Sequence, residues 1–259
     1  MKIFHINAFT SALFTGNPAA VCVLDKWLPD DLLFSIAREN NLPVTAFILK
    51  QKEHFEIRWM TPELEIDICG HGTLSAAYVV FQHLAKTLEK VIFKSKTELL
   101  EVNRRGDDII LNFPEKLIEA CHYDFLEAAL GVKPVATYNH KNERVMVVLP
   151  TEASVRDLKP DMATLKKITQ RGITVTAAGS EADFVSRTFY PKNELVKEDA
   201  VTGAAHCLLV PYWSHQLNKT RLSARQLSRR GGEIQCEYAG DRVLLAGKAV
   251  LYKAGEVLL

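Results

Sequence analysis

Two short segments of the sequence contain side chains that suit proton-transfer chemistry. The segment LEIDICGHGT (64–73) places His71 between two glycines, and the segment VKEDAVTGAA (196–205) places Asp199 four residues before Gly203. Imidazole and carboxylate groups are among the side chains that most often accept and donate protons in enzymes. We therefore predict that His71 and Asp199 form an acid/base pair that acts on a substrate bearing a carboxylate.

Each segment runs directly into an apolar stretch that predicts a buried helix. These stretches are GTLSAAYVVFQHLA, from Gly72, and GAAHCLLVPYW, from Gly203. A helix N-terminus carries unpaired N–H groups and a partial positive charge, and glycine lets a ligand approach the backbone closely. We expect both N-termini to bind the small carboxylate. The spacing of the small and polar residues adds these to the predicted substrate-binding site: Asn17, Pro18, Gly70, Gly72 and Gly203.

Structural roles compete with these functional ones. A histidine beside an apolar helix is often a structural group, and Asp67 has the alternative of capping the helix or pairing with Arg58. Glu198 is expected to be a solvated neighbour of the predicted catalytic carboxylate. The Cys-x-His pair at 69–71 and the His-Cys pair at 206–207 lack the repeated spacing of zinc sites, so no metal is predicted.

The composition is that of an ordinary globular enzyme or binding protein. Of the 259 residues 47% are hydrophobic and 24% are charged, and the formal net charge of +1 provides no field for nucleic acid or an anionic membrane. The N-terminal segment lacks the features of a signal peptide, and no apolar run reaches the ~18 residues of a membrane span. Five scattered cysteines suit free thiols in a reducing compartment, so we expect a cytoplasmic protein. No phosphate or dinucleotide loop is evident, and we expect no cofactor.

Short alternating or β-branched runs predict the elements that must position the two segments. In the first half these strands are KIFHINAF, AAVCVLD, TAFILK, HFEIRWM, KVIFKS, ELLEVNR and DIILNFP, with an amphipathic helix at PDDLLFSIARENN. The second half repeats the order with ATYN, RVMVVLP, a polar helix near DMATLKKITQ, GITVTAA, DFVSRTFY and the second apolar helix. Three more strand-like runs follow, EIQCEY, RVLLAGKAVLY and the tail.

This order predicts an α+β fold with two similar domains. We place the domains at residues 1–118 and 119–259, with the option that the last strand crosses back to the first domain. Each domain is expected to be a curled, mostly antiparallel sheet wrapped around one central helix. The two predicted helix N-termini would then face a cleft between the domains.

Five collinear segments resemble the phenazine biosynthesis-like (PhzF-like) family of isomerases. They are FTGNPAAVCVLD, IARENNLPVTAFI, RWMTPELEIDICGHGTLSAA, EDAVTGAAHCLLVPYW and LSRRGGEI. The resemblance implies a diaminopimelate epimerase-like fold of two domains, a cofactor-independent isomerase and a homodimer. It also implies that the active site lies between the domains, and it adds these residues to the substrate-binding set: Val44, Thr73, Thr202 and Ala204.

The sequence departs from the family motifs at positions that matter for catalysis. The S-E-T-A-F motif, whose glutamate moves a proton on the substrate, falls on a segment in which Val44 stands in place of that glutamate. The C-G-H-A-T motif keeps His71 but has Gly72 for alanine. The E-D-P-x-T-G-S-A motif keeps Asp199 but has Ala204 for serine. Valine neither accepts nor donates a proton, so the family's usual proton shuttle is absent.

Three functions remain open at this point. The first is an isomerase with an altered substrate or reduced activity that uses His71 and Asp199. The second is a family member that binds a small molecule without turnover. The third, implied by the epimerase relatives of the fold, is a racemase with two catalytic cysteines, for which Cys69 is placed suitably and Cys207 is expected to point into the core.

Overall fold

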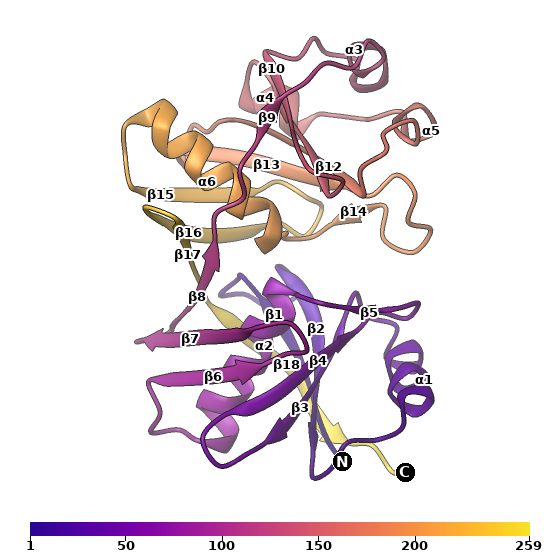
Figure 1. Ribbon diagram of the computed structural model, residues 1–259, viewed down its shortest axis with the longest axis vertical. Coiled ribbons are helices and arrows are strands. Elements are labelled where there is room, and N and C mark those ends of the chain that lie inside the picture. The colour runs from indigo at the N-terminus through magenta and orange to yellow at the C-terminus, as the bar shows by residue number, and fades with distance from the viewer. The chain divides into compact units, whose positions relative to one another are not determined.

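A computed structural model describes all residues of the chain, 1–259 (Figure 1). The chain divides into two compact units, which are described separately. Unit 1 contains residues Met1–Phe113 and Leu244–Leu259, and unit 2 contains Pro114–Val243. Unit 2 is therefore one continuous segment, whereas unit 1 takes its last strand from the end of the chain.

Unit 1 is a curled sheet that packs on the apolar helix α2. Its elements are β1 (Lys2–Ala8), β2 (Asn17–Leu24), α1 (Asp30–Asn40), β3 (Thr45–Lys50), β4 (Phe55–Met60), β5 (Glu65–Ile66), α2 (Gly70–Val79), a π-helical turn (Val80–Leu84), β6 (Lys90–Lys94), β7 (Leu99–Arg105), β8 (Asp108–Pro114) and β18 (Ala249–Glu256). Helix α2 contacts β1, β2, β3 and β18, and all its residues except His71 and Tyr78 are buried. The predicted all-round burial of this helix is confirmed.

The opposite face of the unit 1 sheet is covered by α1. Leu33, Ile36 and Ala37 of α1 pack with Phe47 of β3 and Met60 of β4. Because side chains alternate between the two faces of a strand, the residues on either side of Phe47 and Met60 face α2 instead. The strand register pairs Ala46 with Trp59, which places that pair on the α2 face.

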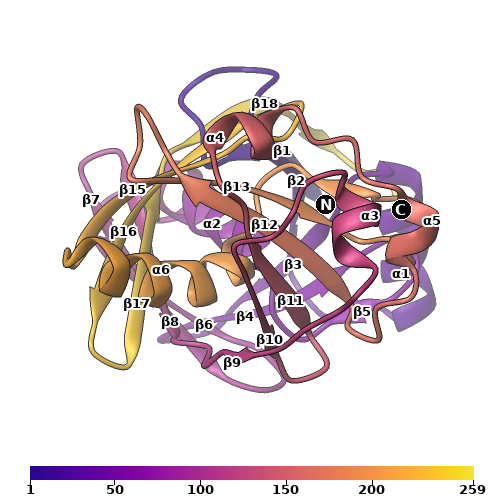
Figure 2. The ribbon, with the colours of Figure 1, turned by 90° about the horizontal axis from the view of Figure 1, so that it is seen from above.

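Unit 2 repeats this architecture around the second apolar helix, α6. Its elements are β9 (Glu119–Ala120), α3 (Leu126–Leu130), β10 (Ala136–His140), β11 (Arg144–Val148), α4 (Glu152–Arg156), α5 (Met162–Leu165), β12 (Gly172–Ala178), β13 (Phe184–Phe189), β14 (Glu198–Asp199), α6 (Gly203–Leu217), β15 (Arg221–Gln226) and β16 (Gly232–Ala239). Strand β17 (Arg242–Gly247) begins at the end of unit 2 and continues into unit 1. The short helices α3, α4 and α5 cover the apolar face of the sheet, and α3 and α5 lie side by side (Figure 2).

The order of parallel and antiparallel pairings is the same in the two units. In unit 1, β1–β2, β3–β4 and β6–β7 are antiparallel, whereas β2–β3 and β4–β6 are parallel. In unit 2, β10–β11, β12–β13 and β15–β16 are antiparallel, whereas β11–β12 and β13–β15 are parallel. The two-strand additions β4–β5 and β13–β14 also correspond. The predicted mixed α+β fold with a curled sheet and similar halves is confirmed.

Several local predictions need correction. The polar helix expected near residues 161–170 is a single turn, α5, and RVLLAGKAVLY forms two strands that separate at Lys248. Three further elements are not predicted, because each is too short to show a hydrophobic period in the sequence: α3, α4 and β15. No helix combines the length and the apolar character that a bilayer crossing requires.

Candidate functional site

The first predicted half-site is built around the N-terminus of α2. Cys69 is the N-cap residue, with an extended backbone (φ −145°, ψ 107°), and its carbonyl oxygen accepts hydrogen bonds from Thr73 N (2.9 Å) and Thr73 Oγ1 (2.7 Å). Thr73 is fully buried. This pair of hydrogen bonds fixes the position of Cys69 against the first helical turn.

Cys69 and His71 form a close side-chain pair at this N-terminus. The Cys69 Sγ atom lies 3.4 Å from His71 Nδ1 and 4.0 Å from His71 Nε2. Cys69 is only 7% exposed, whereas His71 is half-buried. A thiol beside an imidazole at a helix N-terminus has two neighbours that favour the thiolate.

Trp59 closes the same corner from β4. A Cβ atom placed on Gly72 would lie 2.8 Å from Trp59 Cδ1, 3.2 Å from Trp59 Nε1 and 3.2 Å from Cys69 Sγ. The indole edge that carries the N–H group therefore occupies the space that an alanine at position 72 would need. Trp59 is 1% exposed, and its Nε1 atom has no hydrogen-bond partner.

The predicted structural role of Asp67 is wrong. Asp67 is exposed and does not cap α2, because the N-cap is Cys69. Arg58, the other predicted partner, instead holds Glu65 with Nε and Nη2 at 2.8 Å each and Asp30 with Nη1 at 2.8 Å. The hydrogen bonds from Arg58 hold the pKa of the Glu65 carboxyl below its ordinary value.

The remaining predicted residues of unit 1 lie on or directly beside strands of the same sheet. Asn17 begins β2 and is buried, whereas Pro18 is half-buried. Val44 directly precedes β3, is fully buried, and accepts a hydrogen bond from Ala20 N through its carbonyl oxygen (3.1 Å). Gly16 has φ +68°, and a Cβ there would lie 2.3 Å from the Ala8 carbonyl oxygen, so this turn requires glycine.

The second predicted half-site is built around the N-terminus of α6. Thr202 is the N-cap residue, and Gly203 and Ala204 are the first two residues of the helix. Asp199 is 8% exposed, and its Oδ2 atom accepts a hydrogen bond from Thr202 Oγ1 (2.8 Å). Gln226 Nε2 donates to Asp199 O (2.8 Å) and to Thr202 Oγ1 (3.1 Å), and Gln226 Oε1 accepts from Thr202 N (2.8 Å). This network fixes the buried carboxylate of Asp199.

A buried polar row leads across the sheet to Asp199. Arg144 on β11 donates to Thr174 Oγ1 and to Tyr190 Oη, both at 3.1 Å, and Thr174 Oγ1 lies 2.9 Å from Thr188 Oγ1. Thr188 is the register partner of Asp199. Arg144 is 7% exposed. Arg144, Gln226 and Trp59 cannot be recognised as site residues from motif spacing, because strand pairing brings them to the two half-sites.

Two further residues of α6 are buried below its N-terminus. His206 Nδ1 donates to Thr202 O (2.8 Å), and burial lowers the pKa of His206 to about 4. Burial raises the pKa of the Cys207 thiol to about 12. Cys207 points into the core as expected, and a thiol with this pKa is unsuited to the second role in a two-cysteine racemase.

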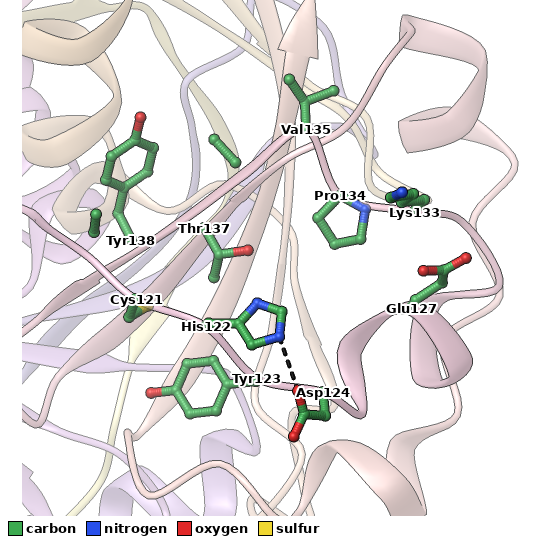
Figure 3. Close-up of a pocket in the computed structure, with 12 residues that line it drawn as sticks. Cys121, His122, Tyr123, Asp124, Glu127, Lys133, Pro134, Val135, Thr137 and Tyr138 are labelled. Atoms are coloured by element: carbon green, nitrogen blue, oxygen red, sulfur yellow. Dashed lines mark hydrogen bonds and ion pairs between the residues drawn. The ribbon is translucent and has the colours of Figure 1, made fainter.

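A pocket of about 530 Å³ lies elsewhere on unit 2, between the segment around β9, strand β10 and α3 (Figure 3). His122 Nε2 lies 2.8 Å from Asp124 Oδ1 at its edge, and both side chains are almost fully exposed. Cys121 also lines the pocket, and burial raises the pKa of its thiol. None of the predicted site residues lines this pocket.

Comparison with known proteins identifies the family. Residues 6–255 match the family model described as phenazine biosynthesis-like protein, PhzC-PhzF. A Pseudomonas aeruginosa protein named as an uncharacterized isomerase is 45% identical over 260 residues, covering 100% of this chain and 99% of the relative. Mouse phenazine biosynthesis-like domain-containing protein 2 is 37% identical, covering 98% of each chain.

Solved structures agree with this result. The crystal structure of a PhzF-family phenazine biosynthesis protein from Enterococcus faecalis has a TM-score of 0.95 and 43% identity, covering 100% of this chain and 99% of that one. A probable proline racemase from Agrobacterium radiobacter has a TM-score of 0.65 at 10% identity over 100% of this chain and 93% of that one, a likeness of fold alone. The chain belongs to the phenazine biosynthesis-like, PhzC-PhzF, family.

Proposed function

We propose that the protein is a cofactor-independent isomerase that moves a proton on a small metabolite bearing a carboxylate. The observation that carries the proposal is the position of His71 at the N-terminus of a buried helix, next to Cys69. An imidazole there can exchange a proton while nearby backbone N–H groups bind an anion. Relatives at 45% and 44% identity are named as isomerases, which supports the same reaction class.

Asp199 is the second proposed catalytic group. Its carboxylate is buried before the N-terminus of α6 and accepts a hydrogen bond from Thr202 Oγ1, and its backbone carbonyl oxygen accepts one from Gln226. Under this proposal His71 and Asp199 act on the same substrate, with the small residues Gly203 and Ala204 beside its carboxylate. A fixed carboxylate costs little reorganisation during proton transfer, which favours catalysis.

The substrate is proposed to differ from that of relatives that keep a glutamate in the S-E-T-A-F motif. Val44, at that position, is fully buried and apolar. The same valine supports the second candidate, a protein that binds the metabolite without turnover.

A homodimer is part of the proposal, and sedimentation of the purified protein tests it.

Isotope exchange tests the proposed reaction. The purified protein is incubated in deuterated water with a panel of small unsaturated and α-substituted carboxylates, and exchange at carbon is followed by mass spectrometry. We expect exchange with at least one compound, and a loss of 10²-fold or more in His71→Gln and Asp199→Asn. His122→Gln, on an exposed residue of unit 2, is the matched control and should exchange at the wild-type rate.

A thermal-shift series with the same carboxylates separates the two candidates. Compounds that stabilise the protein but undergo no exchange favour binding without turnover. Exchange that survives unchanged in both His71→Gln and Asp199→Asn would contradict the proposed catalytic pair.

A further inference from the structure

We propose that Cys69 is the group that takes the proton from the substrate carbon, with His71 as its proton partner. This inference rests on the proposed isomerase function and names the base of that reaction. Val44 cannot serve, and the ionisable side chains at the N-terminus of α2 are those of Cys69 and His71. The backbone of Cys69 is fixed at this corner, because Thr73 holds the Cys69 carbonyl through two hydrogen bonds.

The N-cap position favours a negative charge on the sulfur. An N-cap side chain lies where serine, threonine and aspartate normally accept hydrogen bonds from the first N–H groups of the helix. Cys69 makes no side-chain capping hydrogen bond in this structure, but a thiolate at this position lies at the positive end of the helix dipole. Helix α2 has ten residues, and Cys69 Sγ lies next to Gly72 in its first turn.

His71 supplies the second interaction. With Sγ at 3.4 Å from Nδ1, the thiol proton can pass to the imidazole, which leaves a thiolate beside an imidazolium. No change in heavy-atom positions is needed for this transfer. The pair therefore carries one proton, which either Cys69 Sγ or His71 Nδ1 can donate.

Trp59 is the independent observation that points to a charged or polar occupant of this corner. Its indole N–H is buried without a partner, which is costly for a polar group. Trp59 Nε1 and Cys69 Sγ each lie 3.2 Å from the position that a Cβ atom on Gly72 would take. Cys69 Sγ is not the hydrogen-bond partner of this N–H group, so an anion formed on the bound substrate would supply the acceptor that it lacks.

The proton step balances without a further reactant. The Cys69 thiolate accepts the proton of a C–H bond next to the substrate carbonyl or carboxylate group, and the electron pair of that bond moves into the adjacent π system. The imidazolium of His71, or the new thiol, then returns a proton to a different carbon of the same π system. The substrate is isomerised, and the pair regains its starting protonation.

The other thiols of the chain provide internal references. Burial raises the pKa of Cys22 and of Cys207 to about 12 and raises that of Cys236. It also raises the pKa of the half-buried Cys121. None of these four thiols is expected to ionise near neutral pH, so they serve as references for the thiol at position 69.

Ultraviolet thiolate absorbance tests the ionisation directly. The pH titration of the wild type is compared with that of Cys69→Ser, and the difference isolates the thiol at position 69. We expect a midpoint below about 7.5, as for thiols at helix N-termini and beside imidazole, and a midpoint raised by about one unit or more in His71→Gln. Trp59→Phe should raise it by a smaller amount, and Cys121→Ser should leave it unchanged. A wild-type midpoint at or above about 8.5, the value of a free cysteine, would overturn the inference.

Isotope exchange separates this inference from the proposed function. Cys69→Ser should lose exchange by 10²-fold or more while keeping the ligand-induced thermal shift, because serine keeps the shape but ionises poorly. Exchange at the wild-type rate in Cys69→Ser would overturn the role of Cys69 and leave the isomerase proposal standing. An absence of exchange in the wild type with every carboxylate would overturn the proposed function itself, whatever the thiol titration gives.

Discussion

Arg58 on β4 and Arg187 on β13 occupy equivalent positions in the two units, and each binds a glutamate through two hydrogen bonds. Arg58 donates to Glu65 at 2.8 and 2.8 Å, and Arg187 donates to Glu198 at 2.7 and 3.0 Å. Each glutamate lies on the two-residue strand that leads toward the N-terminus of the central helix. An arginine–glutamate pair therefore holds in place the short strand that precedes the central helix in each unit. Glu198 is a paired residue, not the solvated neighbour that the sequence predicts.

Replacing these arginines should destabilise the two units unequally. Arg187 Nη1 also donates to the carbonyl oxygens of Val155, Arg156 and Leu158, at the end of α4, whereas the additional partner of Arg58 is the exposed Asp30. We expect Arg187→Lys to cost about 1–3 kcal/mol, because lysine cannot keep this set of hydrogen bonds, and Arg58→Lys to cost less. Urea unfolding measures the free energy of unfolding of both variants. An equal or larger cost for Arg58→Lys would contradict the account.

His206 should make the protein less stable in mild acid. Its pKa is about 4 in the folded state and 6.5 when exposed, so the unfolded chain binds a proton first as the pH falls. This contribution to stability is present above pH 6.5 and is lost between pH 6.5 and about 4. Between pH 7 and pH 5 the wild type should lose about 2 kcal/mol more than His206→Gln. Denaturant unfolding at both pH values measures it, with His122→Gln as the exposed control. Parallel losses in wild type and His206→Gln would refute the assignment.

Gly72→Ala should disturb the corner at the N-terminus of α2. The new Cβ would lie 2.8 Å from Trp59 Cδ1 and 3.2 Å from Cys69 Sγ, so the indole must shift. We expect a loss of about 1–3 kcal/mol in stability, as for overpacked cores, together with a changed Cys69 ionisation midpoint. Gly255→Ala is the matched control, because no atom lies within 4 Å of its added Cβ. A fully stable Gly72→Ala protein with an unchanged midpoint would show that the contact is easily relieved.

Val44→Glu tests whether the missing carboxylate explains a change of substrate. The wild type should fail to isomerise dihydro-hydroxyanthranilate, the substrate that the family resemblance implies. Val44→Glu together with Ala204→Ser should produce measurable exchange, at a lower melting temperature, because position 44 is fully buried. Deuterium exchange is measured for the wild type, both single variants and the double variant. High wild-type activity would show that the glutamate is dispensable.

Much of the fold follows from local patterns in the sequence. Alternating and β-branched runs mark the strands of both halves, and the unbroken apolar character of 72–81 and 203–213 marks the central helices. Strands β5 and β14 have two residues each and carry no periodic signal, although they position the chain before each helix. Their existence depends on pairing with β4 and β13.

The site is less accessible to such reasoning, because its decisive contacts join residues from different elements. Asp67 resembles a helix cap by type and distance, yet the helix begins at Gly70 and the cap is Cys69. Trp59 meets Gly72 only through the packing of β4 on α2. Motif spacing therefore predicts which residues line the corner but not which of them contact one another.

The pairing of β1 with β18 has a consequence for synthesis of the chain on the ribosome. Lys2 pairs with Glu256 and Ala8 with Ala249, so one edge of β1 has no partner until residues 249–256 have been made. Unit 2, by contrast, is complete once Val243 has been added. During translation the second unit is therefore able to close first, and the half-site of Cys69 and His71 gains its full sheet only after residues 249–256 have been added.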